Sequence, residues 1–146
     1  MSHPFPRIAH IGIAVNSLDA ALTLYHDTLR LSLHGREEVS SERVKVAFLP
    51  VGDTEIELLE ATSPDSPIAR FIQKHGEGIH HLAFEVDDLD AALDAVRQRG
   101  FRLIDDQPRP GAGGTRVAFL HPKSTNGVLI ELCERQPATT QESHDV

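Results

Sequence analysis

The chain carries one sequence pattern twice, with a histidine at the start of each copy. HIGIAVNSLDAALTLY at 10–25 returns about 71 residues later as HLAFEVDDLDAALDAV at 81–96. Each copy later contains an apolar segment with a carboxylate inside it, Glu57 in the first and Glu131 in the second. Such a chain has to pack two similar units against each other, and each unit brings one histidine and one glutamate to a matched position.

Hydrophobic periodicity predicts the same order of elements in both copies. The first copy is expected to contain a strand at 8–15, a helix at 18–29, and strands at 31–39, 44–51 and 54–60. The second is expected to contain a strand at 79–86, a helix at 89–99, and strands at 102–106, 116–121 and 128–133. The repeat therefore predicts two βαβββ modules.

A βαβββ module leaves one face and one edge of its sheet open, so two modules side by side bury each other's open sheets. We expect an α+β fold with one curved, cup-like mixed sheet and helices on its outer face. The modules are about 8–62 and 79–135, within a single domain at 8–135, and a linker helix joins them at 63–78. We expect an N-terminal arm at 1–7 and a disordered, polar tail at 136–146.

The acidic composition limits the partners that the protein can bind. The formal net charge is −8, so no basic surface favours nucleic acid or an anionic membrane. No apolar stretch is long enough for a membrane helix. Cys133 is the only cysteine, which fits a reducing, cytoplasmic compartment. An anionic substrate would therefore need a local positive centre.

A bound metal ion could provide this positive centre. Imidazole and carboxylate groups bind divalent cations such as zinc, nickel, cobalt or manganese. His10, His81, Glu57 and Glu131 would converge if the modules pack with approximate twofold symmetry. Any one of them alone is better explained as a strand-end histidine or a solvent-facing glutamate. Four matched positions favour a metal site.

The alternation of side chains along the strands predicts which residues face the cup. It places His81 inside and His80, whose offset partner is Ala9, on the helix side. If Val46, Phe48, Val117 and Phe119 face the helices, the cup is also lined by Lys45, Ala47, Arg116 and Ala118.

Two residues near the last hairpin are further candidates. His121 follows a predicted strand and either contacts the substrate or the metal ligands, or packs a loop. Lys123 lies in the hairpin turn and is a candidate for binding a phosphate or carboxylate.

These motifs resemble the vicinal oxygen chelate (glyoxalase/bleomycin-resistance) superfamily, and within it the methylmalonyl-CoA epimerase family. The resemblance covers about 8–134 and is carried by HIGIAV, GDTEIELLE, DSPIARF, GIHHLAFEVDD, FLHPKS and GVLIEL. It implies one divalent metal per chain, with cobalt favoured and zinc, nickel or manganese as alternatives. The implied ligands are His10, Glu57, His81 and Glu131.

The resemblance also implies an activity and an assembly. The activity is epimerisation of (R)- and (S)-methylmalonyl-CoA, between propionyl-CoA carboxylation and the formation of succinyl-CoA. The proton at C2 would be removed and returned through a metal-stabilised enolate. An acyl-CoA substrate and a homodimer follow from the same resemblance.

The chain departs from the family pattern at two positions. Several epimerases have glutamine where this chain has Glu57, and they have a catalytic glutamate at the position aligned with Lys45. Glu131 is therefore the better-supported base. The second base would be Glu57 or, after it, a neutral Lys45; alternatively, a charged Lys45 binds the substrate carboxylate. With Lys45, the candidates for substrate binding are Arg116, His121 and Lys123.

Two other functions are compatible with the same sequence. The combination of two histidines and two glutamates is also similar to glyoxalase I (lactoylglutathione lyase). The superfamily further includes metal-free proteins that sequester ligands without catalysis. The presence of all four candidate ligands argues against the second alternative.

Overall fold

The computed structural model describes residues 7–135, and the predictions for 1–6 and for the tail at 136–146 lie outside this range. The first module contains β1 (Arg7–Ala14), α1 (Leu18–Leu22), β2 (Gly35–Val39), β3 (Val44–Val51) and β4 (Thr54–Ala61). The second contains β5 (Gly78–Glu85), α3 (Leu89–Gln98), β6 (Arg109–Pro110), β7 (Thr115–Leu120) and β8 (Ile130–Arg135). α2 (Pro67–His75) lies in the linker, and the short segments η1 (Thr23–Thr28), η2 (Ser40–Glu42), η3 (Ala112–Gly114) and η4 (Pro122–Ser124) complete the fold.

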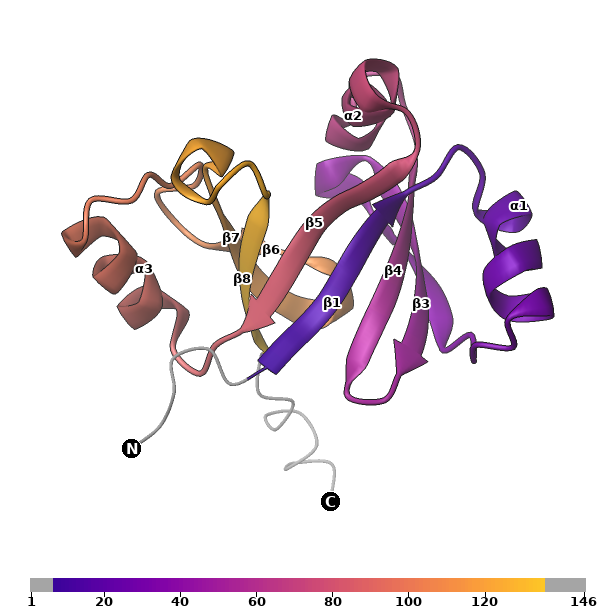
Figure 1. The fold of residues 1–146 in the computed structure, drawn as a ribbon, viewed down its shortest axis with the longest axis horizontal. Helices are drawn as coiled ribbons and strands as arrows, with labels where there is room; N and C mark the ends of the chain where they lie inside the picture. Colours follow the sequence, from indigo (N-terminus) through magenta and orange to yellow (C-terminus); the bar gives the residue numbers. More distant parts are fainter. Residues whose placement is uncertain (1–6, 136–146) are drawn as a thin grey trace.

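All the strands belong to one eight-stranded mixed sheet in the order β2-β3-β4-β1-β5-β8-β7-β6. β1 and β5 run antiparallel at its centre (Figure 1). β1 pairs with β4 in parallel, and β5 pairs with β8 in parallel, so the order reads the same outward from the centre in each module. The predicted α+β fold with two repeated modules and a curved sheet is confirmed.

The two central strands each contain an irregularity next to a candidate ligand. The β1–β5 register runs from Ile8↔Phe84 directly to His10↔Ala83, so Ala9 is an extra residue in β1. It also runs from Gly12↔His81 to Ile13↔Ile79, which makes His80 an extra residue in β5. A β-bulge re-aims the side chains beside it. These bulges lie at positions that the repeat relates to each other.

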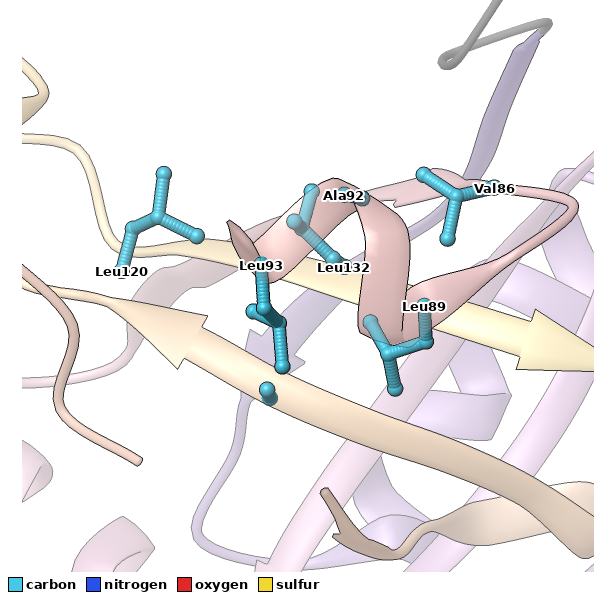
Figure 2. Close-up of a cluster of buried hydrophobic side chains, with 7 residues drawn as sticks. Val86, Leu89, Ala92, Leu93, Leu120 and Leu132 are labelled. Carbon is cyan, nitrogen blue, oxygen red and sulfur yellow. The ribbon is translucent and has the colours of Figure 1, made fainter. Parts of the chain in front are cut away.

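Helices α1 and α3 cover the outer face of the sheet, one on each flank (Figure 1). Leu89 and Leu93 of α3 are almost fully buried and lie against Leu132 of β8 (Figure 2). Ala118 of β7 belongs to the same cluster. Burying one leucine side chain stabilises a fold by roughly 1.5–3 kcal/mol, so these contacts fix α3 on the sheet. Leu18 and Leu22 make the equivalent cluster beneath α1.

The linker helix α2 differs from the prediction that helices lie on the outer face. Its Ile68 packs with Val44, Val46 and Leu59, whose side chains point into the cup. Ser66 caps the helix by accepting a hydrogen bond from the Ile68 backbone N–H at 3.1 Å. α2 therefore closes one end of the cup.

Two predicted strands also differ from the structure. The strand expected at 31–39 is shortened to β2, and the strand expected at 102–106 is replaced by an isolated bridge between Leu103 and Leu120. There the Asp105 carboxylate, rather than a backbone carbonyl, accepts the Phe119 N–H at 2.7 Å. A side-chain acceptor substitutes for ladder pairing, and regular pairing resumes only at β6. Between residues 7 and 135, no helix is long and apolar enough to cross a membrane.

Candidate metal centre

Four strands at the centre of the sheet bring the two histidines and two glutamates together. His10 and His81 come from β1 and β5, and their Nε2 atoms are 3.0 Å apart. Oε1 of Glu131, on β8, is 3.0 Å from His81 Nε2 and 3.4 Å from His10 Nε2. Oε2 of Glu57, on β4, is 3.3 Å from His10 Nδ1. The four residues predicted from the repeat therefore form one cluster.

All four side chains are buried, with residue exposures between 5 and 9 %. Acidic residues are almost never fully buried unless they are paired, and buried charges are paired or bind metal ions. Two imidazoles and two carboxylates within contact distance form a donor set that suits a divalent cation. The residues therefore fit a metal site.

Gly12 makes room for one of these side chains, the His81 imidazole. A Cβ atom at Gly12 would lie 2.2 Å from Cε1 and 2.6 Å from Nδ1 of His81. The His81 imidazole thus rests directly on the β1 backbone. The edge-on contact of His81 with Phe119, at 5.7 Å between ring centroids, holds the ring from another direction.

Burial and proximity change the proton affinities of the cluster. Burial raises the pKa of Glu57 to about 7 against the opposing effect of His10. Burial alone would lower the pKa of His10, but Glu131 and Glu57 raise it to about 9. For Glu131, burial acts to raise the pKa, but hydrogen bonds from His10 and His81 hold it well below its ordinary value. The two carboxylates therefore differ in proton affinity although the repeat relates their positions.

His80 lies beside the cluster, contrary to the prediction that it faces the helices. Its Nδ1 is 2.9 Å from Nδ1 of His81, and its ring contacts Phe71 of α2 edge-on at 5.0 Å between centroids. The bulge in β5 explains the error, because an extra residue interrupts the alternation that the prediction assumed. Burial lowers the pKa of His80 to about 4, so its ring is neutral at physiological pH.

Cys133 is a further buried neighbour, and its sulfur could join His10 and Glu131 in a ligand group. Burial raises the pKa of this thiol to about 12. Because the thiolate is the form that binds metals, the protonated thiol is a poorer donor than the glutamates.

A cavity of about 90 Å³ opens above the cluster on the side of His80 and α2. His10, Glu57, His81 and Glu131 form part of its wall. The remaining lining is mostly apolar and includes Val44, Val46, Leu59, Val117 and Phe119. A wider hollow of about 620 Å³ lies on the other side, next to Ala9, Glu55 and Cys133.

The prediction that Lys45 and Arg116 line the cup is wrong. Ala47, which shares the face of Lys45, packs under α1, while Lys45 itself is exposed. Arg116 lies on the α3 side, where it pairs with Asp90 at 3.4 Å and with Glu134 at 2.8 Å. Both β3 and β7 contain an uninterrupted VAFL run, so alternation could not show which face is buried in the cup. Val46, Val117 and Phe119 take the inward positions.

His121 and Lys123 lie at the outer end of β7. The His121 ring accepts a hydrogen bond from the Lys123 backbone N–H at 3.1 Å and caps η4. Neither residue lines the two hollows beside the cluster. Their part in substrate binding stays a prediction.

The match of this fold and site to known proteins is extensive. Residues 9–119 match the family model of the Glyoxalase/Bleomycin resistance protein/Dioxygenase superfamily. The chain belongs to this superfamily. It is 41 % identical over 128 residues to the ethylmalonyl-CoA/methylmalonyl-CoA epimerase of Cereibacter sphaeroides, which covers 86 % of this chain and 96 % of the relative.

Solved structures of superfamily members agree with this relationship. Methylmalonyl-CoA epimerase from Mycobacterium tuberculosis has a TM-score of 0.91 and 37 % identity, covering 96 % of this chain and 95 % of that one. A variant of the Streptomyces coelicolor epimerase in complex with 2-nitronate-propionyl-CoA has a TM-score of 0.86 and 38 % identity, covering 91 % and 99 %. The similarity thus extends over nearly all of the described fold.

Two charged residues that line the small cavity were not identified from the sequence. Glu42 in η2 and Arg109 in β6 both line it and form an ion pair at 3.1 Å. They come from different modules and from irregular segments, so neither the repeat nor strand alternation could identify them. The linker motif DSPIARF could have indicated where this side of the cavity lies, because the helix that it forms, α2, is part of the cavity wall.

Proposed function

We propose that this protein is a metal-dependent epimerase that interconverts (R)- and (S)-methylmalonyl-CoA. The observation that carries the proposal is the buried cluster of His10, His81, Glu57 and Glu131 at the wall of a small cavity. Epimerases of methylmalonyl-CoA among its relatives support the choice of substrate.

The order of the strands places the two candidate bases, Glu57 and Glu131, on opposite sides of the two histidines. Glu57 lies on β4 and Glu131 on β8, and the two histidine strands, β1 and β5, lie between them. The carboxylates therefore approach the centre from opposite directions. Epimerisation needs removal of the C2 proton from one face and its return to the other, and two opposed carboxylates meet that need.

The differing proton affinities of the two carboxylates suit these roles. The low pKa of Glu131 keeps it ionised, and Glu57, whose pKa is about 7 in the metal-free protein, becomes the more basic carboxylate once its proton has been displaced on metal binding. Glu131 contacts both histidines through Oε1, which leaves Oε2 as the oxygen that takes the substrate proton. The reverse reaction exchanges the two roles.

His10, His81, Glu57 and Glu131 would hold the divalent cation. When bound, it would supply positive charge that stabilises the negative charge developing on the thioester oxygen. The apolar wall formed by Val46, Leu59 and Val117 keeps water away from C2. Exclusion of water strengthens the electrostatic interactions of the ionised groups and protects the thioester from hydrolysis.

The direct test is exchange of the C2 proton of methylmalonyl-CoA with deuterium oxide, followed by NMR. Protein loaded with Co²⁺ should exchange the proton and convert one epimer into the other, and the metal-stripped protein should do neither. Loading with Zn²⁺, Ni²⁺ or Mn²⁺ in parallel tests whether cobalt gives the highest rate. Turnover of the methylglyoxal–glutathione adduct without C2 exchange would assign the glyoxalase I reaction instead.

A further inference from the structure

The guanidinium of Arg109 lies in the wall of the small cavity, where it can contact a bound ligand. Of the described residues that line the cavity, Arg109 is the only lysine or arginine. Its Cζ lies 5.3 Å from the centroid of the Phe119 ring, and that ring contacts His81. One aromatic side chain therefore separates the guanidinium from a candidate metal ligand.

The guanidinium is incompletely satisfied where it is. Nη1 of Arg109 is 3.1 Å from Oε2 of Glu42. Nε is 3.4 Å from Oδ1 of Asp105, but it is buried and makes no hydrogen bond. A guanidinium has five N–H donors in a planar fork that matches a carboxylate. Donors therefore remain for an anionic ligand.

The chemistry of the proposed substrate matches this position. The acyl group of methylmalonyl-CoA carries a free carboxylate next to C2. Between residues 7 and 135, the acidic side chains on the cavity wall are Glu42, Glu57 and Glu131. Glu57 and Glu131 would be compensated by the proposed metal ion, but Glu42 would repel the carboxylate unless Arg109 compensates it. We propose that Arg109 binds this carboxylate, which takes the place of Glu42 in the ion pair. This inference rests on the proposed function and names the residue that selects acyl groups bearing a carboxylate.

The size of the cavity favours the acyl carboxylate over a phosphate of the coenzyme. A cavity of about 90 Å³ admits a small acyl group and leaves the nucleotide outside. The alternative role for the pair is structural, since Glu42 belongs to the first module and Arg109 to the second. The two roles predict different responses to substitution.

A pair of variants separates the binding role from the structural one. Glu42→Gln and Arg109→Gln each break the same ion pair, so a structural role predicts similar losses in both. A binding role predicts opposite changes in the KM for methylmalonyl-CoA of the metal-loaded enzyme. Arg109→Gln should raise KM by roughly tenfold or more, because it removes a charge-assisted hydrogen bond. Glu42→Gln should lower KM because the competing carboxylate is gone, and Arg109→Lys should lie between wild type and Arg109→Gln.

A matched pair of ligands identifies the group that Arg109 binds. Propionyl-CoA has the same coenzyme as methylmalonyl-CoA but lacks the carboxylate. Calorimetry should show that Arg109→Gln leaves propionyl-CoA binding unchanged and weakens methylmalonyl-CoA binding. Equally weakened binding of both thioesters to Arg109→Gln would place a coenzyme phosphate at Arg109. A raised KM in both Glu42→Gln and Arg109→Gln would mean that the ion pair is only structural. Either result overturns the proposal. Absence of C2 exchange in the wild-type protein would instead refute the epimerase function, so the two failures are distinguishable.

Discussion

The two modules have the same fold, but the residues around their histidines differ. Ala9 occupies the bulge before His10, whereas His80 occupies the bulge before His81. Gly12 lies beneath the His81 ring, and its counterpart in the repeat is Ala83. The shared residues form the buried cluster of histidines and glutamates. Among the differing residues, His80 lines the small cavity, whereas Ala9 lines the wider hollow on the other side. The repeat therefore accounts for the positions of the candidate ligands, and its departure at His80 marks the side of the small cavity.

The largest expected effect tests whether the paired glutamates are equivalent. Glu131→Gln and Glu57→Gln should each reduce epimerisation by roughly 10²–10⁴-fold, because each removes one of two bases. Each variant should still exchange the C2 proton of one epimer, the opposite epimer in the two cases. NMR of the separate epimers in deuterium oxide measures this. Loss of exchange from both epimers in Glu131→Gln alone would show that a single base acts on both faces.

Metal analysis of the two glutamine variants is the control for this experiment. Glutamine retains an oxygen donor, so the metal content should stay close to that of the wild type. The activity of a variant that loses its metal would not report on proton transfer. Its epimerisation rate should then be measured at saturating Co²⁺ and compared with that of the other variant.

The glycine beneath His81 gives the next largest effect. Gly12→Ala should lower metal affinity by about 100-fold or more, because the new methyl group would occupy the space of the imidazole. Ala83→Gly, at the matched position, should leave metal affinity unchanged and cost about 1 kcal/mol of stability. Competition with a chelator measures the affinity. Equal affinities in the two variants would mean that the β1 backbone does not position His81.

His80 distinguishes the second bulge from the first. Its neutral ring lies at hydrogen-bond distance from His81 Nδ1 and can accept the N–H that fixes His81 with Nε2 toward the metal. His80→Phe keeps an aromatic ring against Phe71 but removes the acceptor, and metal affinity should fall by about 10–100-fold. His80→Asn supplies a carbonyl oxygen and should recover part of the loss. Equal affinities in both variants would reduce His80 to a packing role.

The sequence predicts one part of this site well because one of its strands, β1, has an informative pattern. In β1, bulky and small residues alternate, so the inward position of His10 follows directly, and the repeat then identifies its three partners. In β3 and β7 both faces are apolar, and a single cation in each, Lys45 or Arg116, is compatible with either face. In the structure, Val46 and Phe119 line the cavity of the cup and the two cations do not.

The remaining site residues depend on features that have no simple sequence signal. The inward position of His80 follows from a register shift between β1 and β5, which strand alternation does not reveal. Arg109 lies between two prolines in the two-residue strand β6, and only the packing of both modules brings it to Glu42. Residues that depend on one strand are therefore predictable, and residues that depend on contact between segments are not.

The smallest expected effect is the pH dependence of stability in the metal-free protein. The folded state raises the pKa of His10 from 6.5 to about 9 and that of Glu57 from 4.5 to about 7. Folding therefore favours the protonated form of both groups, and the stability that this provides is lost as pH rises through these folded values. Between pH 6.5 and 9, the free energy of unfolding should fall by about 1–2 kcal/mol, as measured by urea denaturation. His10→Gln should flatten this dependence, while His121→Gln, outside the cluster, should leave it unchanged.

Metal binding should reverse the trend, because the ligands must lose these protons to bind the cation and its affinity then rises with pH. A metal-free protein whose stability rises from pH 6.5 to 9 would show that the cluster is not held together by its bound protons.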